Sequence, residues 1–189
     1  MQEVRSSFFG SSVAPFRLVF IMWLVFSIEF FGSFDFGWLG IRPRTFSGLI
    51  GILTAPMIHG NLSHLISNTV PLLFLGSTLF FFYSRIGRTV FFRCYIWTNL
   101  LVWIFSPRIS YHIGASGLIY GLSSFLIFFG LIRKDFWSLM ISIIIFMMYG
   151  GIFYGVLPLD PHVSCESHLA GSIVGAATAI DLRNNKKVR

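Results

Sequence analysis

The chain has 189 residues, of which 55% are hydrophobic and only 11% are charged, and its formal net charge is +7. Soluble domains carry roughly 25% charged residues, so this composition excludes an ordinary soluble domain, a disordered chain and a small secreted scaffold. We interpret the excess of Lys and Arg as topology signals at membrane borders, not as a nucleic-acid surface. We expect the lipid bilayer as a partner and no nucleic acid.

Six apolar stretches are candidates for membrane-crossing helices, which need about 20 residues each. They run approximately over residues 15–34, 61–83, 89–106, 116–132, 136–157 and 168–182. The sequence therefore predicts an all-α membrane protein, with a single domain over 1–189 built as a bundle of six transmembrane helices. The first stretch is expected to be an anchor and not a removed signal peptide.

The basic residues predict the orientation of this bundle. Six spans put both termini on one side, and 11 of the 14 Lys and Arg residues fall on that side, leaving Arg42, Arg44 and Arg108 on the other. The positive-inside rule then places both termini in the cytoplasm, and the expected location is a cell (inner) membrane. Cys94 and Cys165 would lie near opposite faces of the bilayer, so no disulfide between them is expected.

The connection over residues 37–60 is too interrupted by Gly, Pro and Arg to cross the membrane, yet it is rich in apolar residues. Two interpretations remain open. The segment either lies in the membrane interface as an amphipathic external loop or packs as a loop over the helix bundle.

Three clusters of polar residues begin predicted spans, where each polar group is a functional hypothesis by default. They are His59 with His64 and Asn68, then Gly114-Ala-Ser116-Gly117 with Tyr120, and then Ser167-His168 with Gly171. Asn68, Ser116 and His168 lie 17, 17 and 15 residues before the arginines that mark the cytoplasmic ends of their helices. At about 1.5 Å per residue, all three lie roughly 22–26 Å from the inner border, near the external face of a hydrocarbon core about 30 Å thick.

A stripe of small residues predicts which helices meet. Gly171 and Gly175 share one helical face with His168, and Gly117 with Gly121 offers a matching pair on the fourth span. Contact between the stripes would bring Ser116 and His168 within hydrogen-bonding reach, as a nucleophile and its general base. Each feature also has a structural explanation, since a serine beside glycine often caps a helix and membrane His or Asn residues often join helices.

Together and in this order, the motifs resemble those of rhomboid intramembrane serine proteases, of the compact six-helix bacterial (GlpG) type. The resemblance covers nearly the whole chain. It implies that Ser116 is the nucleophile, that His168 is its base and that His64 and Asn68 stabilise the oxyanion. It also implies that Tyr120 packs on the His168 ring, with Gly114 and Gly117 at the substrate site. Residues 37–60 would form a membrane-embedded loop, and the fifth span with residues 157–167 a substrate gate.

The resemblance further implies a serine endopeptidase that cleaves single-span membrane proteins near the external face, with no cofactor and no metal. A Ser–His dyad is expected, because Glu166 lies two positions before His168 and would point away from it on a helix. One departure is Ser167, where the family often has alanine. The alternatives are a catalytically inactive relative that binds membrane clients and a small transporter or channel.

Overall fold

The computed structural model describes residues 13–157 and 163–184, and of residues 152 and 153 only the backbone. Within this part, six helices of 14 residues or more dominate the chain. They are α2 (Val13–Gly32), α4 (Leu62–Phe82), α5 (Ser84–Phe105), α6 (Ser116–Arg133), α7 (Phe136–Tyr149) and α8 (Cys165–Leu182). Short helical turns connect them: η1 (Gly37–Leu39), η2 (Ser47–Leu49), α3 (Gly51–Thr54), η3 (Ala55–Met57) and η4 (Gly150–Val156). The fold is all-helical over the described residues, as predicted.

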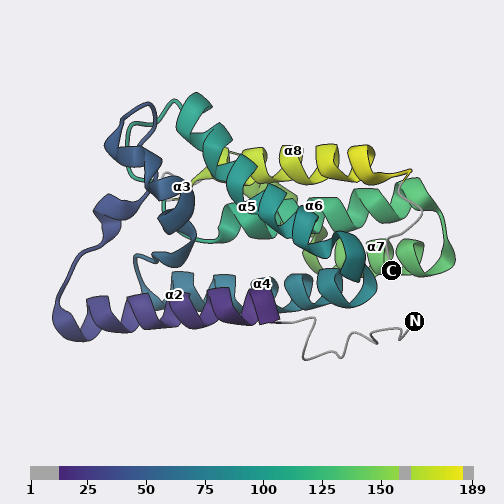
Figure 1. The fold of residues 1–189 in the computed structure, drawn as a ribbon, viewed down its shortest axis with the longest axis horizontal. Coiled ribbons are helices and arrows are strands. Elements are labelled where there is room, and N and C mark those ends of the chain that lie inside the picture. The colour runs from purple at the N-terminus through teal and green to yellow at the C-terminus, as the bar shows by residue number, and fades with distance from the viewer. Residues whose placement is uncertain (1–12, 158–162, 185–189) are drawn as a thin grey trace.

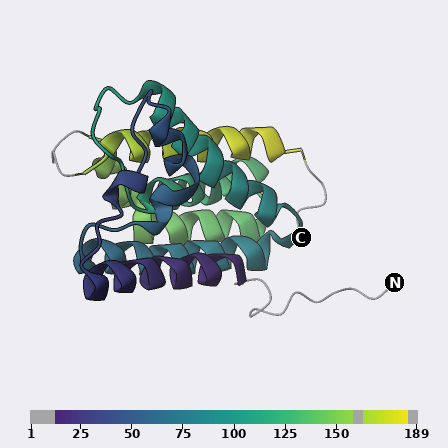
Figure 2. The same cartoon turned by 60° about the vertical axis from the view of Figure 1, so that its left-hand side comes forward.

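Helix α6 occupies the centre of the bundle. It contacts α4, α5, α7 and α8, and its closest neighbour is α8. Most α6 residues are buried, including Leu122, Phe125 and Phe129. A helix that is apolar on every side in this way is surrounded by other helices. Figures 1 and 2 show α2 and α4 side by side as a layer on one side of this core.

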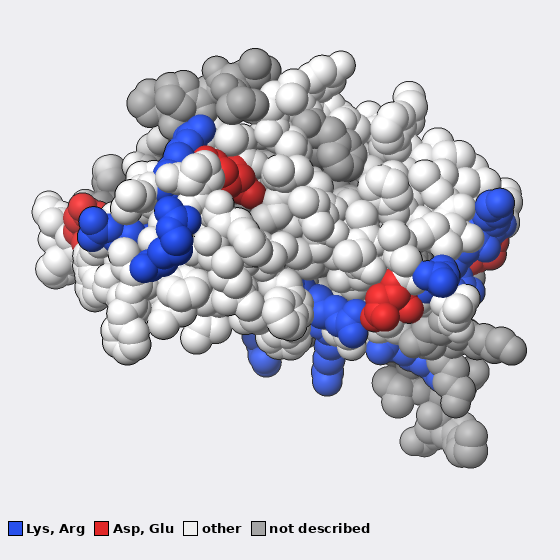
Figure 3. Space-filling model, turned by 90° about the horizontal axis from the view of Figure 1, so that it is seen from above, with Lys and Arg blue, Asp and Glu red and all other residues white. Residues whose placement is uncertain are grey.

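The outward faces of the long helices are apolar. Phe20, Phe92, Met147 and Ile173 all expose more than half of their surface. Residues without charge cover most of the face in Figure 3, and charged side chains gather at its left-hand end and along its lower right-hand edge. Three helices, α2, α4 and α6, are long and apolar enough to cross a membrane by length and composition. An exposed apolar surface of this extent identifies a membrane protein.

The helices correspond in order to the six predicted spans, but three of them differ from the predicted bounds by three residues or more at one end. Helix α5 begins at Ser84, five residues earlier than predicted, because the polar first turn around Arg85 and Arg88 is helical as well. Helix α7 ends at Tyr149, and a 3₁₀ segment follows from Gly150. Helix α8 begins at Cys165, three residues earlier, because the Ser164 side chain caps it. By length and composition α5, α7 and α8 are not among the candidate spans of the described chain, so the six-span count remains a prediction.

The connection over residues 37–60 is an ordered series of short turns held against α5. Three α5 side chains, spaced four residues apart on one helical face, donate hydrogen bonds to its backbone carbonyls. Tyr95 donates to Leu53 at 2.5 Å, Asn99 to Ile52 at 3.0 Å and Trp103 to Thr45 at 2.9 Å. On the side that faces α5, the connection is therefore a loop packed over the helix bundle. The opposite side of the connection exposes Trp38, Phe46 and Leu53. Contact of this side with the membrane interface remains a prediction.

Candidate active site

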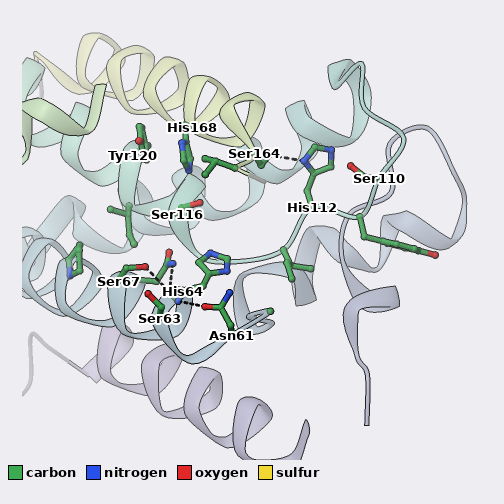
Figure 4. A pocket seen from close by; sticks show the side chains of 17 residues that line it. Asn61, Ser63, His64, Ser67, Ser110, His112, Ser116, Tyr120, Ser164 and His168 are labelled. Atoms are coloured by element: carbon green, nitrogen blue, oxygen red, sulfur yellow. Dashed lines mark hydrogen bonds between the residues drawn. The ribbon is translucent and has the colours of Figure 1, made fainter. Parts of the chain in front are cut away.

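The first turns of α4, α6 and α8 lie toward the same end of the bundle, at the left in Figure 1. A cavity of about 670 Å³ opens there. Most of the residues that line it have polar side chains, and they come from α4, from the loop before α6, from α6 and from the start of α8. The lining residues include His64, Ser67, Asn68, Ser110, His112, Ser116, Tyr120, Ser164 and His168. Each of the three polar clusters singled out in the sequence therefore contributes side chains to one cavity (Figure 4).

Ser116 is the first residue of α6 and faces the cavity. The capping position belongs to Ala115, whose side chain makes no capping hydrogen bond. Ser116 therefore does not serve as the helix cap, which was the structural explanation that the sequence left open for it. The first amide groups of a helix have no intrahelical acceptors, so the N–H groups at this end of α6 are available to a ligand.

His168 lies in the first turn of α8 and points toward Ser116 (Figure 4). Its Nδ1 lies 2.9 Å from the carbonyl oxygen of Gly155. A carbonyl only accepts, so Nδ1 carries the proton and donates it, which leaves Nε2 unprotonated on the neutral ring. No hydrogen bond between Ser116 Oγ and His168 occurs in the described structure, and such contacts are often long without substrate.

One further contact fixes the imidazole of His168. Tyr120, one turn below Ser116, stacks on it with ring centroids 3.9 Å apart and an interplanar angle of 7°. Glu166 is engaged elsewhere, in an ion pair with Arg108 at 2.9 Å. The ring is therefore held by a carbonyl and an aromatic face, not by a carboxylate.

His64 and Asn68 enter the cavity from α4. Asn61 caps this helix by accepting a hydrogen bond from the His64 amide at 2.8 Å. Asn68 donates one amide proton to the His64 carbonyl at 2.7 Å, which leaves its second amide proton for another acceptor. The His64 ring lies over Gly114, where an added Cβ would come within 2.6 Å of Nε2. Gly114 has φ +101°, which also favours glycine there.

The predicted glycine stripes are in contact. A Cβ added at Gly171 would overlap the carbonyl oxygen of Gly117, and one added at Gly175 would overlap that of Gly121. Helices α6 and α8 therefore pack backbone to backbone, which sets the separation between Ser116 and His168. Gly117 also faces Thr98 of α5. Gly114 and Gly117 do not line the cavity, so the structure places them in its supports.

Three residues around the cavity escaped the sequence analysis. The carbonyl of Gly155 holds the ring of His168. His112 and Ser164 join the loop before α6 to the start of α8, with His112 Nδ1 and Ser164 Oγ 2.7 Å apart. Ser164 has the residue type of a helix cap, which is the one signal that the sequence offered. Gly155 and His112 lie outside the long helices, so no helical periodicity marks them.

Two histidines outside the long helices have lowered pKa values. Burial, and next the charge of the neighbouring His64, lowers the pKa of His59 to about 4. The His59 ring packs against the His64 ring edge to face, with centroids 4.9 Å apart. Burial also lowers the pKa of His112. Both rings are neutral at physiological pH.

Over the described residues, no group of three or more His, Cys, Asp or Glu side chains could hold a metal ion. The absence of a cofactor and of a metal remains a prediction.

The fold and the cavity define a helical membrane protein with a serine and a histidine facing each other near one end of the bundle. The chain belongs to the rhomboid family, because the family model described as Rhomboid domain matches residues 47–185. Proteins of Mycobacterium tuberculosis (strain ATCC 25618 / H37Rv) and Mycobacterium bovis are 33% identical to it over 186 residues, covering 90% of this chain and 73% of theirs. A Mycobacterium leprae protein is 36% identical over 156 residues, covering 74% of this chain and 59% of its own. All three are named as uncharacterized proteins.

Proposed function

We propose that this protein is an intramembrane serine endopeptidase that uses Ser116 and His168 as a catalytic dyad. The observation that carries the proposal is the hydrogen bond from His168 Nδ1 to the Gly155 carbonyl. It leaves Nε2 as the free acceptor on a ring that points toward Ser116. That tautomer and orientation are what a general base for a serine hydroxyl requires.

In the proposed reaction, Ser116 Oγ attacks a backbone carbonyl carbon of the substrate while His168 Nε2 takes the hydroxyl proton. The tetrahedral intermediate collapses, the C–N bond breaks, and His168 passes its proton to the leaving amine. Water then attacks the acyl-enzyme ester, again giving a proton to His168, and Ser116 regains its hydroxyl proton as the ester bond breaks.

The negative charge of the tetrahedral intermediate needs donors aimed at one oxygen atom. The uncapped amides at the start of α6 supply the first of them. The second amide proton of Asn68 and a ring N–H of His64 are the side-chain donors in the same cavity. Tyr120 acts on the imidazole of His168 and not on the substrate.

Family membership and the apolar outer surface support a substrate that approaches through the bilayer, namely the transmembrane segment of a single-span protein. The cavity lies at the end of the bundle that the charge distribution assigns to the external side. We therefore propose six spans, both termini in the cytoplasm of a cell (inner) membrane, and scission near the external face. A gate formed by α7 and the loop after it stays a prediction, because residues 158–162 lie outside the described part.

The test is cleavage of a single-span reporter protein by the purified enzyme in proteoliposomes. Ser116→Ala and His168→Ala should each abolish cleavage without loss of thermal stability, because removing half of a nucleophile–base unit costs nearly as much as removing both. Ser123→Ala is the matched control, since Ser123 is a buried α6 serine bonded to the Ile119 carbonyl and does not line the cavity. Cleavage by Ser116→Ala at the parent rate would refute the proposal. Binding of the reporter without cleavage by the parent enzyme would favour an inactive client-binding relative.

A further inference from the structure

His112 is the meeting point of three parts of the protein around the cavity. Its backbone pairs with that of Ile41, in the connection over residues 37–60, through two hydrogen bonds of 2.8 and 2.9 Å. Its ring Nε2 lies 3.1 Å from the hydroxyl of Ser106, just after α5. Its ring Nδ1 lies 2.7 Å from the hydroxyl of Ser164, which caps α8. The residue is only 4% exposed, so water has little access to these contacts.

The neighbours of the ring indicate which nitrogen carries the proton. Nε2 also lies 3.4 Å from the carbonyl oxygen of Arg108, which can only accept. The proton therefore belongs on Nε2, and Nδ1 accepts from the Ser164 hydroxyl. The oxygen of Ser164 in turn accepts from Ser167, whose hydroxyl lies 2.7 Å and whose amide lies 3.3 Å away. When His112 is neutral, its two ring nitrogens and the hydroxyl groups of Ser164 and Ser167 all have hydrogen-bond partners.

Ser164 connects the network to the proposed base. It is the residue immediately before α8, and its carbonyl accepts a hydrogen bond from the amide of His168 at 3.3 Å. His168 lies one helical turn later, so any movement of Ser164 moves the imidazole relative to Ser116. We propose that His112 is a positioning residue, which sets the location of His168 by holding Ser164 against the loop that leads into Ser116.

A second contact between the same two segments is weaker. Arg108 pairs with Glu166 at 2.9 Å and donates to the Val163 carbonyl at 3.1 Å. The Arg108 side chain is 31% exposed, and solvent reduces what such an ion pair contributes. The buried contact between His112 and Ser164 therefore provides the more rigid link.

The inference rests on the proposed function and is tested by the rate at which a fluorophosphonate probe labels Ser116 in the purified protein. This small probe measures the reactivity of the nucleophile without transmembrane substrate binding. His112→Ala and Ser164→Ala should each lower the rate about tenfold or more, since misplacement by about 1 Å costs up to about 10². The double variant should lose no more than Ser164→Ala alone, because that substitution already removes the contact that His112→Ala removes.

Two amide substitutions separate positioning from general stability. The amide of asparagine overlaps the position of Nδ1, and that of glutamine overlaps Nε2. His112→Asn should therefore keep the contact with Ser164 and label within about threefold of the parent, while His112→Gln should label as slowly as His112→Ala. Glutamine restoring the rate better than asparagine would overturn the proposal, as would parent-like labelling of Ser164→Ala, a substitution that removes only a hydroxyl.

Ser142→Ala serves as a stability control, because it removes a buried hydrogen bond to the Ile127 carbonyl between α6 and α7, away from the cavity. It should lower the melting temperature without changing the labelling rate. If the parent protein is not labelled at Ser116 at all, the proposed function fails. If the parent is labelled and the His112 and Ser164 variants match it, only the positioning role fails.

Discussion

Replacing Gly155 with alanine should lower the proposed proteolytic activity through one added methyl group. An alanine Cβ at this position would overlap the hydroxyl oxygen of Tyr120 and come within 3.2 Å of His168 Nδ1. Tyr120 is stacked on His168, so its ring cannot yield without moving the imidazole. A shift of about 1 Å in a reacting group costs up to about 10² in rate, and we expect kcat to fall between tenfold and a hundredfold.

The assay is the initial rate of reporter cleavage in proteoliposomes, with the melting temperature measured in parallel. Gly151→Ala is the matched control, because a Cβ there has no atom of the described residues within 4 Å, and it should cleave at the parent rate. Tyr120→Phe removes the oxygen that the new Cβ meets, so adding it to Gly155→Ala should recover about tenfold of the lost activity. Equal activity of Gly155→Ala and Gly151→Ala would refute the assignment of Gly155 as the group that orients His168.

Three further predictions concern the oxyanion donors, the position of scission and pH. Asn68→Ala and His64→Ala should each lower kcat about 10²–10³-fold with little change in KM, the usual effect of losing one oxyanion donor; a change in KM alone would make them interhelical contacts. Mass spectrometry of the reporter fragments should map the cut to the external third of its span, and a cut at the cytoplasmic end would contradict the orientation. The pKa of His59 is lowered from 6.5 to about 4, so the unfolded chain binds a proton in this range that the folded protein excludes. The contribution of His59 to the free energy of unfolding should therefore be fully present above pH 6.5 and fall by about 3 kcal/mol as the pH drops to 4. His59→Phe should flatten this dependence of melting temperature on pH, and an unchanged slope would show that another group is responsible.

The sequence was sufficient to predict the helical bundle and five of the side chains that meet in its cavity, namely His64, Asn68, Ser116, Tyr120 and His168. Apolar stretches locate helices because a helix satisfies its backbone hydrogen bonds within a single segment, as the bilayer interior requires. Counting residues from the terminal arginines placed Asn68, Ser116 and His168 at one depth, and all three line one cavity. The glycine stripes predicted contact between α6 and α8, and the pairs Gly171–Gly117 and Gly175–Gly121 confirm it.

The orientation of His168 could not be predicted in the same way. The contact with Gly155 joins α8 to a 3₁₀ segment that the sequence pattern had assigned to a straight helix. The bonds from His112 join residues 6 and 52 positions apart, and they depend on how two loops approach each other. Periodicity identifies the face that a helix buries, but it does not carry information on such contacts between loops.

The central claim, that Ser116 is a nucleophile activated by His168, is tested most directly by mapping the residue that a fluorophosphonate probe modifies. We predict a single adduct on the peptide that contains Ser116, formed by the parent protein and by Ser123→Ala. The adduct should be absent from Ser116→Ala and at least a hundredfold slower to form in His168→Ala. An adduct on another serine, or labelling of Ser116 at the parent rate in His168→Ala, would contradict the account.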